Sequence, residues 1–258
     1  MSSQSKEVTG KNGIESGTVF SSQGVSVPTW VVISAVLAGL SVLHLALHYF
    51  EHGVVNVHHA VLAFFLVLNL LVNFWEFGLF FQGDAIREEY LSNREKYRSE
   101  PMDYVMVIFN RRIPVTQLLS FKQWTGIWSS YCFFDPGYSR RGSFGFNIDV
   151  GNGFSTVLPA LLFAFGMTYE MVSARLLGII GVAMFWQMFY GTVVYFFQFF
   201  NAGRHIGHTR KNLFLFVVNS NGFWFFFPVW GMLVSIWMIY ENSYSIFTDS
   251  GVSLWSIF

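Results

Sequence analysis

Residues 213–240 read LFLFVVNSNGFWFFFPVWGMLVSIWMIY and contain no Asp, Glu, Lys, Arg or His. An apolar run of this length is too long for a buried helix of a soluble protein, and it is long enough to cross a bilayer at a tilt. The run therefore predicts a membrane-spanning helix.

One face of this predicted helix is polar. At about 100° per residue, Asn221, Trp224, Pro228 and Ser235 fall within about 60° of one another. An unpaired polar group is costly in hydrocarbon, so this face should point at protein or at a polar cavity rather than at lipid. Asn221 then has two interpretations that the sequence leaves open: it joins two helices, or it contacts a bound ligand.

The composition of the whole chain agrees with a membrane protein. Hydrophobic residues make up 53%, aromatic residues 20% and charged residues only 12% of the sequence, and the mean hydropathy is +0.45. The 15 basic and 15 acidic residues cancel without forming a dense basic block, which gives no support to a nucleic-acid partner. A single cysteine, Cys132, excludes an internal disulfide framework and a multi-cysteine metal site.

Five apolar runs predict an all-α, five-transmembrane-helix bundle over residues 27–240. The predicted spans cover about 27–50, 57–81, 153–171, 176–200 and 213–240. Residues 1–26 are rich in Ser and Gly and are predicted to be a disordered tail. We expect residues 82–152 to form a polar and interfacial loop, and residues 241–258 to form a carboxy-terminal tail. The glycine-rich segment SRRGSFGFNIDVGNGF, residues 139–154, is expected to turn the chain back toward the membrane.

The basic residues fall on one side of this predicted topology. Fourteen of the 15 Lys and Arg residues lie in the amino-terminal tail, in the loop 82–152 or in the connection between the fourth and fifth spans. By the positive-inside rule, the amino terminus and the long loop are predicted to be cytosolic.

Ionisable side chains inside the first two spans are candidates for function. His44 and His48 share one face of the first span, and Asn69, Asn73 and Glu76 share one face of the second. Burial in a membrane favours the protonated form of a carboxyl group, which is what a general acid needs. The alternative is a structural role, in which Glu76 bonds to Asn73 or to a histidine of the first span.

The fourth span also has a polar face, on which Gln187, Gly191 and Gln198 align beside Tyr190. Most of the spans therefore turn a few polar groups in one direction, and the remaining positions are mostly aliphatic or aromatic. Such a bundle has an aromatic-walled, sparsely polar interior that suits a large, flat and mostly apolar ligand.

Four short patterns occur in order in the second half of the chain. They are W-x-x-Y-x-x-x-D-x-x-Y at Trp128, Tyr131, Asp135 and Tyr138; a glycine and an aromatic at Gly151 and Phe154; Y-G-x-x-x-Y-F at Tyr190, Gly191, Tyr195 and Phe196; and N-x-x-W-x-x-x-P at Asn221, Trp224 and Pro228. In these patterns, and in its five predicted spans, the chain resembles the emopamil-binding protein group. This group is the EXPERA membrane-domain superfamily, which includes sterol Δ8-Δ7 isomerases.

The resemblance implies an intramolecular isomerase of the endoplasmic reticulum membrane. Such an enzyme protonates a ring double bond, holds a carbocation and removes a proton from the neighbouring carbon, so it needs an acid, a base and an aromatic or amide wall. Glu76 matches the family's first carboxylate, and Asn221 and Trp224 match its wall. The family histidine one turn before that carboxylate is replaced by Val72, and Pro159 stands where the third span carries a second carboxylate.

Two hypotheses follow from this comparison. In the first, the chain is a double-bond isomerase acting on a sterol or another polycyclic isoprenoid, with Glu76 paired to His44 or His48 as the catalytic groups. In the second, it is a non-catalytic sterol or lipid binder, or a trafficking protein, that keeps the pocket without the chemistry. The residues expected to contact the ligand are Asn73, Trp128, Tyr131, Asp135, Gln187, Tyr190, Asn221 and Trp224.

The histidines admit a third interpretation, as metal ligands. His44, His48 and His52 follow one another at four-residue spacing, and His205 and His208 lie three apart. Membrane di-iron hydroxylases need more histidines in close-set pairs, so we expect no metal and no cofactor, with haem held between two histidines as the alternative. The expected partners are the hydrophobic polycyclic ligand and the lipid bilayer, and the sequence leaves open whether the chain forms a homodimer.

Overall fold

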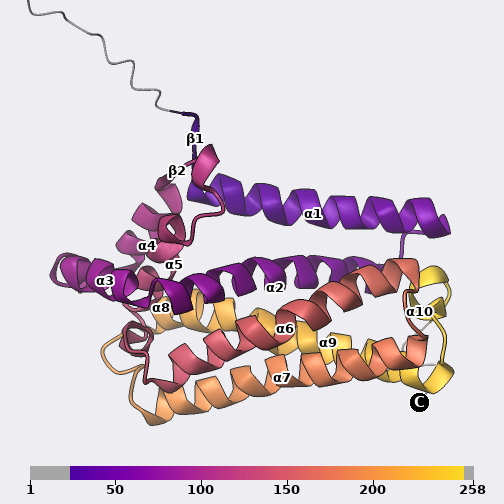
Figure 1. The fold of residues 1–258 in the computed structure, drawn as a ribbon. Coiled ribbons are helices and arrows are strands. Elements are labelled where there is room, and N and C mark those ends of the chain that lie inside the picture. Colours follow the sequence, from indigo (N-terminus) through magenta and orange to yellow (C-terminus); the bar gives the residue numbers. More distant parts are fainter. Residues whose placement is uncertain (1–23, 253–258) are drawn as a thin grey trace, which may run out of the picture.

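The computed structural model describes residues 24–252, and nearly all of them belong to helices (Figure 1). Within that range, five helical segments are long and apolar enough to cross a membrane. They are Thr29–His52 (α1), Val57–Phe81 (α2), Phe144–Tyr169 (α6), Ala174–Asn201 (α7) and Arg210–Glu241, which joins α8 (Arg210–Asn212), the π-helical segment η4 (Leu213–Val218) and α9 (Asn219–Glu241). The predicted all-α bundle with five membrane-spanning helices is confirmed.

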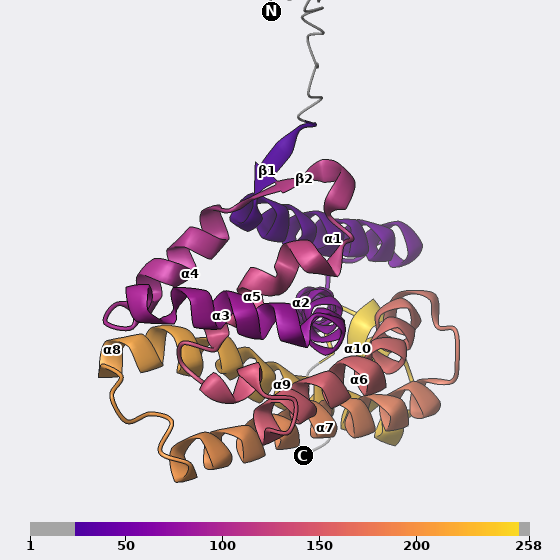
Figure 2. The same cartoon turned by 60° about the vertical axis from the view of Figure 1, so that its left-hand side comes forward.

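The shorter elements gather at the two ends of the bundle (Figures 1 and 2). One end holds α3 (Gly83–Tyr97), α4 (Pro101–Asn110), α5 (Thr125–Tyr131) and the 3-10 turns η1 (Val115–Gln117), η2 (Phe121–Trp124) and η3 (Pro136–Ser139). There too, β1 (Ser26–Pro28) pairs antiparallel with β2 (Arg112–Pro114), with Ser26 opposite Pro114. The opposite end holds the connections α1–α2 and α6–α7, together with α10 (Ser245–Thr248).

The third span begins earlier than the sequence predicts, at Phe144 rather than near residue 153. The glycine-rich segment before residue 153 was expected to be a turn, but it forms the first turns of α6. Ser143 caps this helix by accepting a hydrogen bond from the Phe146 N–H at 3.2 Å. A Cβ at Gly145 would lie 3.1 Å from the Tyr138 ring, so this glycine permits close packing rather than a turn.

The two predicted tails have different outcomes. Residues 1–23 of the predicted amino-terminal tail lie outside the described residues. The predicted carboxy-terminal tail includes α10, where Ile246 and Phe247 are fully buried against the bundle. Burial of two large apolar side chains stabilises this docked helix by about 3 kcal/mol or more, so residues 245–248 belong to the folded domain.

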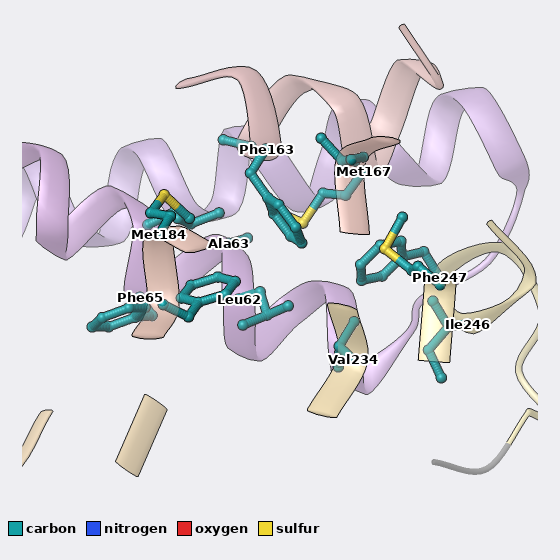
Figure 3. Close-up of a cluster of buried hydrophobic side chains, with 14 of the residues drawn as sticks. Leu62, Ala63, Phe65, Phe163, Met167, Met184, Val234, Ile246 and Phe247 are labelled. Carbon is teal, nitrogen blue, oxygen red and sulfur yellow. The ribbon is translucent and has the colours of Figure 1, made fainter. Parts of the chain in front are cut away.

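The main core lies between α2, α6, α7, α9 and α10 (Figure 3). Phe65, Phe163 and Phe185 are completely buried there, and their rings contact one another in tilted or edge-to-face arrangements. Helices α7 and α9 approach most closely, because a Cβ at Gly231 would lie 2.5 Å from the Phe185 ring. A Cβ at Gly178 would lie 2.6 Å from the Ser235 carbonyl oxygen, so small residues permit the contact, as is common between membrane helices.

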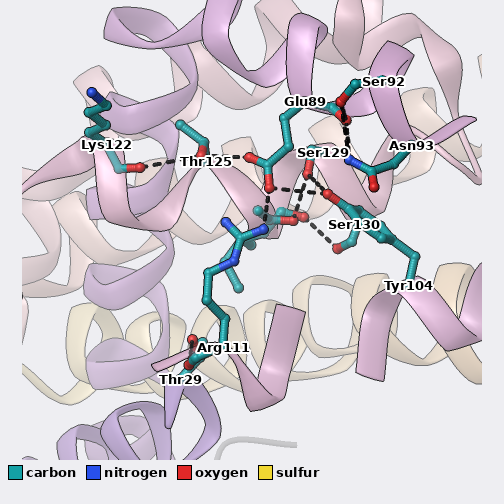
Figure 4. Close-up of polar contacts among 12 residues, drawn as sticks. Thr29, Glu89, Ser92, Asn93, Tyr104, Arg111, Lys122, Thr125, Ser129 and Ser130 are labelled. Atoms are coloured by element: carbon teal, nitrogen blue, oxygen red, sulfur yellow. Dashed lines mark hydrogen bonds and ion pairs between the residues drawn. The ribbon is translucent and has the colours of Figure 1, made fainter. Parts of the chain in front are cut away.

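A polar network joins α3, α4 and α5 at the end that carries the loop (Figure 4). Glu89 of α3 forms an ion pair with Arg111 and accepts hydrogen bonds from the Tyr104 hydroxyl at 3.1 Å and the Thr125 hydroxyl at 2.7 Å. Tyr104 also bonds to the Ser129 hydroxyl of α5 at 3.1 Å. The network therefore fixes α5 beside the bundle.

Candidate active-site cavity

A cavity of about 240 Å³ lies inside the bundle, at the end where α5 packs against the membrane-spanning helices. Residues of α2, α4, α5, α6, α7, η4 and α9 line it. Its wall is mainly apolar and aromatic, and contains Trp75, Trp128, Tyr131, Tyr195 and Trp224. Its lining residues include no Lys, Arg or His, so the polar groups that face it are carboxyls, amides and hydroxyls.

Glu76 is the carboxyl group that α2 contributes to the cavity, and it is 3% exposed. Asn152 of α6 donates its amide Nδ2 to both carboxyl oxygens, at 3.1 and 3.2 Å. With its amide nitrogen turned toward Glu76, Asn73 donates to Oε2 at 2.9 Å and accepts from the Thr156 hydroxyl at 3.1 Å. Two amides therefore hold Glu76 in one orientation at the edge of the cavity.

The close approach of α6 to α2 at this point depends on Gly153. A Cβ added to this glycine would lie 2.8 Å from the Glu76 Cβ and 3.1 Å from its Oε2. Any residue larger than glycine would push the two helices apart. Glycine at this position therefore allows the Asn152 amide of α6 to reach the Glu76 carboxyl of α2.

Asp149 brings a second carboxyl group to the same cavity. It lies one turn before Asn152 on α6 and lines the cavity together with Glu76. Tyr138 of η3 lies beside it. The ring of Tyr138 stacks on Trp128 at a centroid distance of 5.2 Å, which fixes the phenol against the α5 wall. The lining of the cavity therefore contains two carboxyl groups and no basic side chain.

Amides and phenols form the opposite side of the cavity. The Asn221 amide donates through Nδ2 to the Tyr131 hydroxyl at 2.7 Å and to the Val217 carbonyl at 2.7 Å. The Tyr131 hydroxyl bonds in turn to the Tyr195 hydroxyl at 3.1 Å. Burial raises the pKa of Tyr131 to about 12, so this phenol is neutral at physiological pH. Both Asn221 donor protons are used within the protein, which leaves its carbonyl oxygen for a ligand.

Two indole N–H groups are also satisfied within the protein. Trp224 donates to the Asn69 side-chain oxygen at 3.1 Å, and Trp128 donates to the Trp75 carbonyl at 2.7 Å. The polar edges of both tryptophans are therefore anchored, and their rings form part of the cavity wall. The Trp224–Asn69 bond shows that the polar faces of α2 and α9 meet each other.

Gln187 of α7 marks the place where the cavity reaches the surface. Its side chain lines the cavity and is also exposed, and it donates to the Ser155 hydroxyl of α6 at 2.5 Å. An exposed polar pair in the middle of two membrane-spanning helices would face lipid, which is unfavourable unless it borders a polar opening. The pair joins α6 to α7 at the mouth of the cavity.

His44 and His48 do not meet Glu76, so the expected catalytic pairing is wrong. The His44 ring bonds to the Ala164 carbonyl at 2.8 Å, and the buried His48 ring bonds to the Phe247 carbonyl at 3.0 Å. His48 also stacks on His59 at 3.7 Å, in the first turn of α2. Glu76 lies near the other end of that helix, about 25 Å further along its axis. The histidines therefore hold α1 to the far end of the bundle.

The histidine cluster was also considered as a metal site. Within residues 24–252, no group of three His, Cys, Asp or Glu side chains is arranged to hold a metal ion. The Nε2 atoms of His44, His48, His52 and His59 instead bond to carbonyl or hydroxyl oxygens of the protein, at 2.6 to 3.0 Å.

Three of the predicted contact residues lie outside the cavity lining. Tyr190 is 54% exposed and stacks on Trp186 on the outer surface of α7. Asp135 is buried, forms an ion pair with Arg204 and accepts a hydrogen bond from the Gly137 N–H at 2.8 Å. Asp135 therefore caps η3 and, through Arg204, attaches the α7–α8 connection to it. Asn73 supports Glu76 from behind and does not itself line the cavity.

Glu76 and five of the predicted contact residues line the cavity, whereas Asp149 and Asn152 line it without having been predicted. Both fell in the segment interpreted as a glycine-rich turn. Their spacing with Thr156, at i, i+3 and i+7, puts all three on one helical face, and this was the signal that could have identified them. The residues that do line the cavity as predicted are Glu76, Trp128, Tyr131, Gln187, Asn221 and Trp224.

Comparisons with known proteins add no further assignment. No family model matches the chain, and neither the curated proteins nor the solved structures contain a match. The geometry of the cavity is therefore the basis for a functional proposal.

Proposed function

We propose that this protein is a membrane enzyme that shifts a carbon–carbon double bond in a sterol or another flat polycyclic isoprenoid. The observation that supports this proposal best is the pair of carboxyl groups, Glu76 and Asp149, in an aromatic-walled cavity without a basic residue. Two negative charges in such an environment are unfavourable, and protonation of one of the two carboxyl groups removes that cost. The pair then contains both the acid and the base that an isomerisation needs.

The reaction requires only proton transfer. One carboxyl group gives its proton to a carbon of the double bond, which forms a C–H bond and leaves a carbocation on the adjacent carbon. The other carboxylate removes a proton from the carbon next to the cation, and the electrons of that C–H bond form the new double bond. The net oxidation state is unchanged, and the pair again holds one proton, which exchanges with solvent before the next turnover.

The wall of the cavity suits the cationic intermediate. Trp75, Trp128 and Trp224 line the cavity, and the face of an aromatic ring attracts a cation by about 0.5–2 kcal/mol. Among the described residues, none donates a hydrogen bond to the Asn221 side-chain carbonyl oxygen, which can direct partial negative charge at the intermediate. The neutral Tyr131 phenol keeps this amide in position.

A sterol profile tests the proposal. A yeast strain that lacks its own Δ8-Δ7 sterol isomerase would carry the native chain, the Glu76→Gln variant or the control Glu51→Gln, whose side chain is exposed on α1. We expect Δ8 sterols to fall with the native chain and with Glu51→Gln, and to stay high with Glu76→Gln. Unchanged sterols in all strains, despite confirmed expression, would exclude this sterol reaction.

A second candidate function is sterol or lipid binding without chemistry. Val72 lines the cavity at the position where the resembling family has a histidine, which favours this alternative. Binding of a fluorescent sterol that survives in the Glu76→Gln/Asp149→Asn double variant, with no product formed by the native chain, would support a binding or trafficking role.

We also propose an endoplasmic reticulum location with a cytosolic amino terminus. The location rests on the family resemblance alone. The orientation is supported by the gathering of basic residues at the end of the bundle that holds α3, α4 and α5, since basic loops favour the cytosolic side. A glycosylation tag inserted between α3 and α4 should remain unmodified. Its glycosylation would refute this orientation.

A further inference from the structure

A second hollow lies outside the bundle, where α2 continues into α3 beside the start of α6. Its volume is about 240 Å³, and it shares no residue with the active-site cavity. Three arginines and one carboxylate face it, in contrast to the neutral and acidic groups of the first cavity. Its lining residues are Gly83, Asp84, Arg87, Ser139, Arg140, Arg141 and Phe146.

Arg141 is held in a fixed position at this hollow. Its guanidinium donates to the Phe80 carbonyl at 2.9 Å and lies 5.8 Å from the centroid of the Phe146 ring. A Cβ at Gly83 would lie 3.2 Å from the guanidinium carbon, so the glycine leaves the space that the arginine fills. The ion pair of Arg141 with Asp84 is long, at 3.8 Å, and largely exposed, and therefore adds little.

The hollow has positive charge that the protein does not neutralise. In the part of the chain that the structure describes, Arg87 and Arg140 form no ion pair with a carboxylate. Three guanidiniums therefore face one exposed carboxylate, Asp84. Planar guanidinium groups match the oxygens of a phosphate, with which they form short, charge-assisted hydrogen bonds.

The surface next to the hollow is apolar. Phe80 and Phe81 of α2 and Phe144 of α6 are 40%, 56% and 40% exposed. The Phe80 ring contacts Phe154 of α6 at 5.5 Å, and Phe77 contacts the same ring at 4.9 Å. The aromatic side chains thus form a continuous seam that runs from the hollow along α2 and α6 toward the middle of the bundle.

We propose that the hollow binds the phosphate group of an anionic phospholipid, whose acyl chains lie along the seam of Phe77, Phe80 and Phe154. A ligand with a phosphate at one end and a hydrocarbon at the other matches both features at once. The position also fits, because the hollow lies at the ends of two membrane-spanning helices, where lipid headgroups are found. Anionic lipids concentrate in the cytosolic leaflet, on the side that carries most of the basic residues.

The test measures thermal unfolding of the full chain in detergent with added lipid. Phosphatidic acid should raise the Tm above the value found with phosphatidylcholine. In the Arg87→Gln/Arg140→Gln variant, the affinity for phosphatidic acid should fall by about tenfold or more, equivalent to about 1.4 kcal/mol. Arg141 is left intact in this variant because its bond to Phe80 also supports the fold.

The matched control is Lys122→Gln/Lys211→Gln, which removes the same charge from two exposed positions at the same end of the protein. It should keep the native affinity. Equal weakening in both variants would overturn the proposal, since it would indicate general attraction of anionic lipid to a basic surface. A Tm increase with glycerol 3-phosphate as large as that with phosphatidic acid would also overturn it, because the site would then take a soluble phosphate.

Discussion

Glu89 is predicted to be the residue that fixes the α5 wall of the cavity. Its carboxylate accepts bonds from the Tyr104 and Thr125 hydroxyls and pairs with Arg111, and its side chain is 17% exposed. Substituting Glu89→Ala removes all three interactions and leaves the partly buried Arg111 guanidinium, which is 35% exposed, without its partner. Hydrogen bonds to a charged group contribute about 1.5–3 kcal/mol each in buried sites, and exposure of the arginine reduces the total.

We therefore expect Glu89→Ala to destabilise the protein by about 3 kcal/mol, which corresponds to a Tm decrease of about 6–12 °C for a chain of this size. The assay is thermal unfolding in detergent, together with the affinity for a fluorescent sterol. Affinity should fall as well, because Thr125 lies on the same helix as the cavity residues Trp128 and Tyr131.

The matched control is Glu88→Ala, an exposed glutamate next to Glu89 on α3. It should change the Tm by no more than about 1–2 °C, since exposed charges contribute little to stability. If Glu89→Ala lowered the Tm no more than Glu88→Ala, the network would not be what holds α5 in place.

Two further predictions concern the cavity. Gly153→Ala should destabilise the protein by about 1–3 kcal/mol and reduce turnover, because the added Cβ would lie 2.8 Å from that of Glu76. The control Gly151→Ala should do neither, because the space beside Gly151 is open. Similar Tm values for the two variants would refute the packing argument. Burial raises the pKa of Tyr131 from 10.0 to about 12, so the folded state holds the phenol proton more tightly than the unfolded state does. The unfolded state therefore loses this proton first, and the free energy of unfolding decreases as the pH rises from about 10 to about 12. Tyr131→Phe should therefore lose less stability than the native chain over that range in unfolding measurements, and parallel losses would contradict the assignment.

The sequence predicted the number, type and approximate positions of the membrane-spanning helices, because hydropathy along the chain determines which segments can cross a bilayer. The second span, 57–81, has the predicted boundaries. The start of the third span was wrong because glycines usually indicate turns, whereas Gly145 and Gly153 permit close contact with Tyr138 and Glu76. Local composition does not show which partner will approach a glycine.

The sequence predicted part of the candidate site, namely the side chains that face the interior of the bundle. Asn221 and Trp224 were expected to face protein or a cavity, and both do, because an apolar helix with one polar stripe has only one favourable orientation. His44 and His48 also face protein, but at the other end of the bundle from Glu76. The spacing of polar residues along the sequence predicts which face of each helix is polar. Which two faces meet depends on the tertiary contacts between the helices.

Proton exchange with solvent tests the central claim, that Glu76 and Asp149 act as one acid–base pair. The purified protein would convert a Δ8 sterol in deuterated water, with the native chain, Glu76→Gln and Asp149→Asn compared for product and for affinity toward a fluorescent sterol. We predict one deuterium at the newly protonated carbon of the native product, and a fall in turnover of about 10²-fold or more in each variant with binding retained. Turnover near the native rate in either variant, or product without deuterium, would contradict the account.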